Sequence, residues 1–267
     1  MEHISTDALK SLLQKYVDDF MSKKDLDFVV SPSIPVVWFG DIEKYQQSPK
    51  RILTISLNPS LHEFPQSPEQ PRFDIVDFSN SNAIDALYTT LNRYFYNNPY
   101  KNWFKKYNKL MSVLDCSYGG QYSNKTNTAI HIDIYTAIAT DPVFGKLTPP
   151  QKEHIQNPDL FDRLFELLDP DIVLISVNEK IFKKHFNNYF EAYTFRYGKK
   201  SKIKGYLKEN QKLIFGTNSN GIPFGSISEA IAQKVIAEIA NLSMVEALTA
   251  KIQELKTELA KFDDSDT

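Results

Sequence analysis

The pair Asn58-Pro59 follows an apolar run, Arg51–Leu57, that has the pattern of a buried strand. Proline fixes the direction in which the chain leaves the strand and keeps the preceding residue out of the α region. An amide held at that point can orient a water molecule or bind a ligand carbonyl. Asn-Pro is also an ordinary turn signal, so the pair alone favours a structural turn.

Three further apolar runs also read as buried strands, and amphipathic helices separate them. The four predicted strands are Arg51–Leu57, Ala129–Thr136, Asp171–Val177 and Lys212–Gly216. The predicted helices are Thr6–Met21, Ser81–Tyr96, Lys101–Leu114, Asn157–Leu168, Glu179–Asn187 and Phe224–Asn241. Buried strands that alternate with helices predict a parallel sheet covered on both faces. We therefore predict an α/β fold, a three-layer α/β/α sandwich around a central, mainly four-stranded parallel sheet.

A ligand site in such a sheet lies beyond the carboxyl ends of the strands. This rule places the candidate site in the loops after Leu57, Thr136, Val177 and Gly216. Asn58 lies in the first of these loops.

The C-terminal segment has a different pattern from the rest of the chain. Its apolar residues are spaced alternately by three and four, as in a short heptad seam: Val245, Leu248, Ile252, Leu255, Leu259 and Phe262. We predict one domain over residues 1–241, followed by an amphipathic helix and an acidic tail over 242–267. The seam is compatible with a homodimer through 242–262 and equally with a monomer in which the helix docks on the domain.

The composition excludes several classes of protein. Cys116 is the only cysteine among 267 residues, which excludes an internal disulfide and a cysteine-ligated zinc or iron–sulfur site. The histidines lack the spacing of metal ligands, so we predict no metal and no cofactor. The longest apolar run, near Ile172–Val177, is too short to span a bilayer. We expect a cytoplasmic protein that has no membrane partner.

Positive charge is concentrated in one segment although the formal net charge of the chain is −2. Four lysines lie within six residues at Lys199, Lys200, Lys202 and Lys204. A segment of this kind can present a positive surface to phosphates. The alternative is a surface loop of solvated lysines, and charge alone does not decide between the two.

The order of these parts resembles the uracil-DNA glycosylase superfamily over roughly residues 36–240. Ser56-Leu57-Asn58-Pro59-Ser60 resembles that family's first motif, whose Asn or Asp positions the attacking water. The stretch 169–182, DPDIVLISVNEKIF, is similar to a strand-and-helix segment of the same fold, and 217–224, TNSNGIPF, occupies the place of the loop that penetrates the DNA stack. The resemblance implies a catalytic Asn58 and a target base that is flipped out of the helix.

The chain departs from the family pattern at two places. Ser56 replaces a glycine of the first motif, and Asn218 occupies the approximate place of the histidine that stabilises the departing base. A neutral amide gives a weaker hydrogen bond than a charged group does. The resemblance therefore implies Asn218 as the second catalytic residue, together with an easier leaving group, a further donor or slow turnover.

Two positions bear on the substrate that the resemblance implies. Asp133 falls near the place of the asparagine that reads uracil, and an ionised carboxylate only accepts hydrogen bonds. Cytosine offers its exocyclic amine as a donor, so the aspartate suits cytosine better than uracil. Ser60 stands where strict uracil enzymes place a tyrosine that blocks the 5-position of the base. Asp133 is equally compatible with a structural role.

Further residues complete the predicted site. Phe39, Phe64 and Phe73 are candidates to stack on the flipped base, and Ile222 and Phe224 are candidates for the wedge that fills the gap in the DNA. Most aromatic residues belong to the core, so each of the three phenylalanines has a structural interpretation as well.

The sequence thus predicts a monofunctional DNA glycosylase that acts on double-stranded DNA. The motif Asn58–Ser60 with Glu63-Phe64 resembles an antiviral branch of the superfamily that removes glucosylated hydroxymethylcytosine from phage DNA. The alternatives are uracil excision in base-excision repair, a DNA-binding module that recognises modified bases without cutting, and a small-molecule enzyme on a similar sheet. No G-x-G-x-x-G or P-loop pattern favours the last of these.

Overall fold

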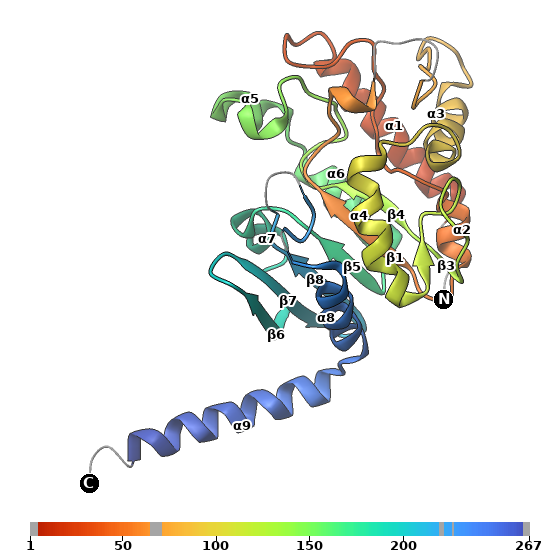
Figure 1. The fold of residues 1–267 in the computed structure, drawn as a ribbon. Helices are drawn as coiled ribbons and strands as arrows, with labels where there is room; N and C mark the ends of the chain where they lie inside the picture. The colour runs from red at the N-terminus through yellow and green to blue at the C-terminus, as the bar shows by residue number, and fades with distance from the viewer. Residues whose placement is uncertain (1–4, 65–70, 219–221, 226, 264–267) are drawn as a thin grey trace. The chain divides into compact units, whose positions relative to one another are not determined.

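A computed structural model describes residues 5–64, 71–218, 222–225 and 227–263 of the chain (Figure 1). These residues belong to two compact units, Met1–Asp171 and Ile172–Thr267. Nothing in the structure bears on the domain boundary predicted at residue 241, which stays a prediction.

The first unit contains two central strands and most of the helices. Its strands are β1 (Ile52–Ser56), β2 (Cys116–Ser117), β3 (Asn127–Thr128) and β4 (Ile130–Asp133). Its α-helices are α1 (Thr6–Lys23), α2 (Ile42–Gln47), α3 (Ala83–Asn92), α4 (Lys101–Met111), α5 (Pro149–Ile155) and α6 (Pro158–Leu168). Short 3-10 turns are η1 (Leu61–Glu63), η2 (Tyr94–Tyr96), η3 (Ser112–Leu114) and η4 (Phe144–Lys146).

Strands β1 and β4 form a parallel pair at the centre of this unit. Every residue of both strands is buried, as expected for a parallel sheet covered on both faces. The amino end of β1 is fixed by Arg51, whose backbone N–H donates to Asp171 Oδ2 at 2.7 Å and whose side chain donates to Asp169 Oδ2 at 2.7 Å. These bonds join β1 to the end of α6 and so hold the strand in place.

The described residues of the second unit form four strands and three helices. Its elements are β5 (Ile172–Ile175), α7 (Glu179–His185), β6 (Phe190–Tyr197), β7 (Ser201–Lys208), β8 (Gln211–Gly216), α8 (Glu229–Asn241) and α9 (Met244–Asp263). Strand β8 pairs in parallel with β5 and antiparallel with β7, and β6 pairs antiparallel with β7.

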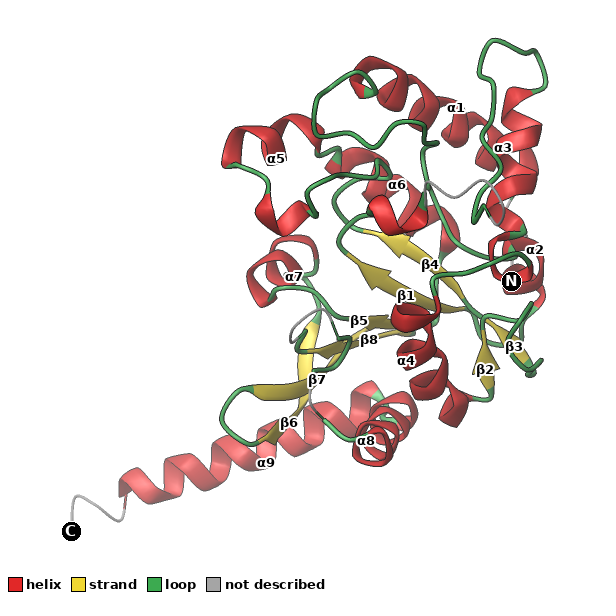
Figure 2. Ribbon diagram, turned by 45° about the horizontal axis from the view of Figure 1, so that its top comes forward, coloured by secondary structure: helices red, strands yellow, loops and turns green. Residues whose placement is uncertain are grey.

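The strands form one six-stranded sheet in the order β4-β1-β5-β8-β7-β6 (Figure 2). The predicted α/β class with helices around a mostly parallel sheet is confirmed, and all four predicted strands are present. The sequence interpretation missed β6 and β7, which it treated as a lysine-rich surface segment. It also missed α5, which begins with a capping box between Thr148 and Gln151. Among the described helices, none is both long enough and apolar enough to cross a bilayer.

Candidate functional site

The parallel register of β1 and β4 places four polar side chains in one buried column. Thr54 pairs with His131, and Ser56 pairs with Asp133 at the carboxyl ends of the two strands. Because side chains alternate between the faces of a strand, these four share one face, while Leu53, Ile55 and their partners take the other. Thr54 Oγ1 lies 2.7 Å from His131 Nδ1 and 2.7 Å from the Tyr118 hydroxyl. The inner end of the column is therefore hydrogen-bonded.

The outer end of the column lacks hydrogen-bond partners among the described residues. Ser56 Oγ and Asp133 Oδ1 are both buried and accept or donate no hydrogen bond within the described part of the chain. His131 Nε2 lies 3.5 Å from Asp133 Oδ1, which is long for a hydrogen bond. Leaving buried polar groups without partners costs free energy, so two of them at adjacent positions favour a site that a ligand completes.

Burial also changes the protonation of Asp133. Removal from water raises the pKa of its carboxyl group, and the neighbouring His131 ring offsets part of that rise. A neutral carboxyl group both donates and accepts hydrogen bonds, whereas the ionised group only accepts. The interpretation of Asp133 as a purely accepting group therefore holds only above its raised pKa.

Asn58 lies directly beyond the end of β1 and is half-buried. Its side-chain nitrogen donates to Thr140 Oγ1 at 3.0 Å and to the Pro59 carbonyl at 2.5 Å. These bonds occupy both amide hydrogens, so the group left to accept a hydrogen bond from water is the amide oxygen. The geometry fits the predicted role of Asn58 in orienting a water molecule, and Thr140 is a supporting residue that the sequence did not indicate.

Ser60 begins the short turn η1, and its hydroxyl accepts a hydrogen bond from the His62 backbone N–H at 3.3 Å. It is half-buried. The next acidic residue, Glu63, is buried and accepts a hydrogen bond from the Tyr94 hydroxyl at 2.5 Å.

Burial and, less strongly, the Asp133 carboxyl raise the pKa of Glu63, the Tyr94 hydrogen bond and the Arg72 charge lower it, and the resulting pKa is about 7. Two carboxyl groups with raised pKa values therefore interact at this end of the sheet. Sequence reasoning noted Glu63 only as part of a motif. Its partner Tyr94 lies 31 residues away in the chain, so no local pattern indicates its burial.

The three phenylalanines predicted to stack on a base lie in one aromatic cluster behind these groups. Phe73 contacts Phe39 and Phe64 with ring centroids 5.8 and 5.6 Å apart. Phe39 also contacts the His131 ring at 5.4 Å and is 2% exposed, so it supports the polar column and presents no open face. Phe64, at 8% exposed, is the most accessible of the three.

Arg72 connects two loops at the edge of this region through hydrogen bonds. It donates from Nε to the His62 carbonyl at 2.7 Å and from a guanidinium nitrogen to the Asn98 carbonyl at 2.6 Å. Its guanidinium also lies over the ring of Tyr100, which stacks on His62 with a centroid distance of 5.2 Å. Residues 65–70, between Phe64 and Arg72, lie outside the described part of the chain.

In the second unit, Asn218 lies beyond the end of β8 and is half-buried. Its amide nitrogen donates to the Ser176 carbonyl, at 3.3 Å, in the loop after β5. Within the described part of the chain, the other hydrogen of this amide donates to no acceptor and can reach a further one. The predicted action of Asn218 on a departing base stays a prediction.

The two wedge candidates differ sharply in exposure. Ile222 is 49% exposed, whereas Phe224 is fully buried and its backbone N–H donates to Ser176 Oγ at 3.1 Å. A Cβ atom on Gly216 would lie 2.3 Å from the Phe224 ring, so the end of β8 is shaped to receive that ring. Phe224 is therefore a core residue, and its prediction as a wedge is wrong because the ring is packed away from solvent. Ile222 is the exposed candidate.

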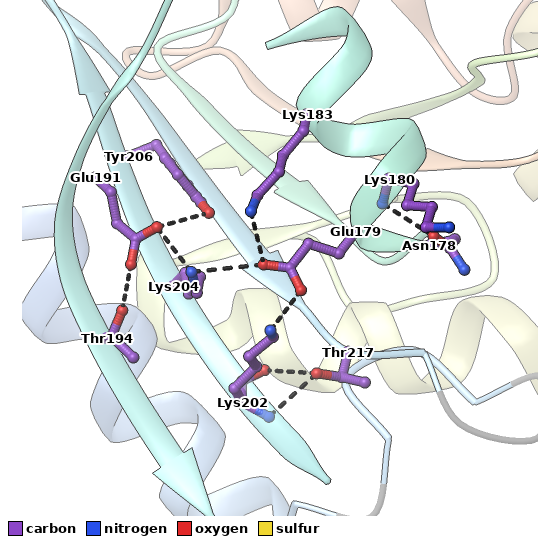
Figure 3. Close-up of polar contacts among 10 residues, drawn as sticks. All are labelled: Asn178, Glu179, Lys180, Lys183, Glu191, Thr194, Lys202, Lys204, Tyr206 and Thr217. Carbon is purple, nitrogen blue, oxygen red and sulfur yellow. Dashed lines mark hydrogen bonds and ion pairs between the residues drawn. The ribbon is translucent and has the colours of Figure 1, made fainter. Parts of the chain in front are cut away.

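The four lysines predicted to bind DNA also divide into two groups. Lys199 and Lys200 are exposed at the turn between β6 and β7. Lys202 and Lys204 point from β7 toward acidic side chains (Figure 3). Lys202 lies 2.5 Å from Glu179, and Lys204 lies 3.5 Å from Glu179 and 2.7 Å from Glu191.

This network removes Lys202 and Lys204 from the predicted DNA contacts, because their charges are already paired within the unit. Lys204 is only 8% exposed. The hydrogen bond from Lys202 holds the pKa of Glu179 below its usual range, as expected for an acid surrounded by lysines. Glu179 itself follows Asn178, which caps α7 by accepting from the Lys180 backbone N–H at 2.9 Å.

Within the described residues, no group of three or more His, Cys, Asp or Glu side chains is arranged to hold a metal ion. Cys116 is buried, and burial raises the pKa of its thiol, so it is not a reactive thiolate. The polar end of β1 and β4, with Asn58, Ser60 and Glu63 around it, is therefore the strongest candidate site. Comparison of the chain with protein-family models and with curated proteins finds no match.

Proposed function

We propose that the first unit binds a flipped pyrimidine base at the carboxyl ends of β1 and β4, and that the protein is a DNA glycosylase. The observation that carries the proposal is the pair of buried, unpartnered polar atoms, Ser56 Oγ and Asp133 Oδ1, at adjacent positions of the two strands. Their neighbour Asn58 holds an amide oxygen at the same strand end, where sheets of this type bind ligands.

The proposed reaction is hydrolysis of the N-glycosidic bond. Asn58 orients a water molecule, whose oxygen bonds to the anomeric carbon as the bond to the base nitrogen breaks. The electron pair of the broken bond leaves with the base, a proton of the water is released, and an abasic site remains. The residues predicted to act, Asn58 and Asn218, carry no amine, so the reaction proposed is monofunctional.

The proposed substrate is a 5-substituted cytosine, such as glucosylated hydroxymethylcytosine in phage DNA, met in the cytoplasm. An ionised Asp133 accepts a hydrogen bond from the exocyclic amine of cytosine, and Ser60 leaves space beside the 5-position. A second candidate is uracil. The raised pKa of Asp133 favours it, because a neutral carboxyl group can accept from uracil N3–H and donate to its carbonyl oxygen.

The direct test is to incubate the protein with glucosylated phage DNA, uracil-containing DNA and unmodified DNA, followed by an abasic-site endonuclease. Strand breaks confined to the glucosylated DNA support the modified-cytosine substrate. Breaks confined to uracil DNA keep the glycosylase and replace the substrate. A protein that binds glucosylated DNA and produces no breaks is a binding module instead.

Two variants connect the activity to the site. Asn58→Ala is expected to lower the single-turnover rate by at least about 100-fold while base binding is retained, because it removes the group that orients water. Asp133→Asn keeps the size of the side chain and fixes it as a neutral donor and acceptor, so the selectivity between cytosine-type and uracil substrates is expected to lose its dependence on pH. The control is Asp77→Asn, at an exposed position away from the two strand ends.

A further inference from the structure

The C-terminal helix α9 leaves a row of large apolar side chains in solvent. Val245 is 75% exposed, Leu248 44%, Ile252 54% and Leu255 47%. Ala247, near the start of the helix, is buried, and the unit's contacts with α9 are made to β6. Every described side chain from Leu248 to residue 257 is exposed, and the helix extends away from the rest of its unit (Figure 1).

These four residues lie on one face of the helix. Their spacings of three, four and three residues make them successive a and d positions of a heptad repeat, with Val245 and Ile252 at a. The sequence continues the repeat with Leu259 and Phe262, whose side chains lie outside the described ones. A contiguous apolar face of this kind marks an interaction surface, and helices in proteins gain most of their stability from packing such a face.

We propose that this face pairs with α9 of a second copy of the chain, in an antiparallel two-helix contact. A second copy supplies a matching apolar row of the same length. The charges beside the row select the direction. In a parallel pair, the g position Lys251, which also lies 2.7 Å from Glu254 of its own helix, would face the e position Lys256 of the other copy, and two like charges would meet twice in each dimer.

The charges also select one antiparallel register. If Lys251 met its own copy across the seam, like charges would again repel, and only part of the apolar row would be paired. In the register that sets Ile252 against Leu255 of the second copy, Val245 and Leu248 also find apolar partners. Lys251 then meets position 258, a glutamate in the sequence. This register pairs the whole row and opposes unlike charges.

The inference is independent of the proposed function, because it rests only on α9. The test is sedimentation velocity of the full chain over a dilution series. A dimer that dissociates on dilution is expected for the unchanged chain. Ile252→Glu is expected to be monomeric at every concentration, because it places a charge in the apolar row. Its control, Gln253→Glu, adds the same charge at the next, exposed position and is expected to dimerise like the unchanged chain.

An unchanged chain that stays monomeric throughout overturns the proposal, as it would if the helix folded back on its own unit. Equal dimerisation of the Ile252→Glu and Gln253→Glu chains places the contact elsewhere and also overturns it. A trimer or tetramer by mass contradicts the two-helix contact.

Two further variants test the direction of the pair. Lys251→Glu is expected to raise the dissociation constant severalfold in the antiparallel register, whereas in a parallel pair it would face Lys256 and tighten the dimer. Under oxidising conditions, a mixture of Ile252→Cys and Leu255→Cys chains is expected to form more cross-linked dimer than either chain alone. Strong cross-linking of Ile252→Cys with itself indicates a parallel pair and overturns the direction proposed. The native Cys116 does not interfere, because it is buried.

Discussion

At the scale of single residues, the two buried carboxyl groups oppose the stability of the fold at neutral pH. Asp133 and Glu63 both have raised pKa values because burial penalises their ionised forms. Ligand-binding sites commonly keep such groups. A substitution that replaces the buried carboxyl group would stabilise the free protein, but it would also remove the group that recognises the ligand.

The destabilising effect of the buried Glu63 carboxyl group can be measured by varying pH. Its pKa is about 7 in the folded protein and 4.5 ordinarily, so the folded state holds its proton more tightly than the unfolded state does. Its contribution to stability is complete below pH 4.5 and is lost as pH rises through about 7. We expect the free energy of unfolding of Glu63→Gln to decline by about 3 kcal/mol less over this pH range than that of the unchanged chain. The reason is that Gln stays neutral and still accepts a hydrogen bond from Tyr94.

The measurement is urea unfolding of both chains between pH 4.5 and pH 8. The exposed Glu153→Gln on α5 serves as the control and is expected to keep the slope of the unchanged chain. A Glu63→Gln chain with an unaltered slope contradicts the assignment of the proton to Glu63.

At the scale of elements, the loop after β8 contains one core residue and one exposed residue only two positions apart. Phe224→Ala is expected to lower the free energy of unfolding by about 3–5 kcal/mol, because the ring is fully buried against Gly216. Ile222→Ala, at 49% exposure, is expected to change it by less than about 0.5 kcal/mol.

The two variants also separate wedge from core in the proposed reaction. If Ile222 fills the gap in the duplex, Ile222→Ala slows excision from double-stranded DNA and leaves excision from single-stranded DNA unchanged, since an unstacked base needs no wedge. Equal slowing on both substrates contradicts the wedge. Single-turnover kinetics on matched oligonucleotides measures the difference.

The β6–β7 hairpin presents Lys199 and Lys200 at its tip and pairs Lys202 and Lys204 with acids on its face. We expect the double variant Lys199→Ala, Lys200→Ala to reduce the salt dependence of DNA binding by a slope of about 2, because each neutralised phosphate adds about 0.9 to that slope. Lys202→Ala is expected to leave the slope unchanged, because the charge of Lys202 is paired with Glu179. It is expected to lower the free energy of unfolding by no more than about 1 kcal/mol, because this ion pair is partially exposed.

Fluorescence anisotropy over a range of salt concentrations gives both slopes. A larger change of this slope for Lys202→Ala than for the Lys199→Ala, Lys200→Ala variant would indicate that the lysines on β7 contact DNA.

The hairpin also shows where sequence reasoning reached its limit. The strands β1, β4, β5 and β8 are rich in apolar residues, so their local composition predicted them. Strand β7 carries Lys202 and Lys204 at alternate positions, which indicates exposure until Glu179 and Glu191 are placed opposite them. Those pairings join separate elements, and no local pattern contains them.

The candidate site divides in the same way. Asn58 follows from its place after a predicted strand, a rule that depends only on element order, whereas Asp133 was predicted only from the family resemblance. Ser56 as an unpartnered neighbour of Asp133 depends on the register of β1 and β4, which the sequence does not specify. Glu63 and Thr140 depend on tertiary contacts and were not predicted as site residues.

At the scale of the whole molecule, the proposed catalytic and association surfaces lie in different segments. We expect a chain that ends after Thr249 to keep its single-turnover rate on the proposed substrate, because the cut leaves the buried Ala247 and every side chain described beyond Thr249 is exposed. The same chain is expected to be monomeric. Gel-based excision assays and sedimentation of the shortened chain provide the comparison, and a lost rate would mean that association contributes to activity.

The alternation of polar and apolar residues along β1 and β4 determines where the chain can gain or lose a residue. A single-codon insertion or deletion inside either strand exchanges its two faces. It would turn Ile55 or Ile132 toward the polar column and drive a serine or an aspartate into the hydrophobic side. We therefore expect insertions and deletions to be tolerated outside these two strands and not within them.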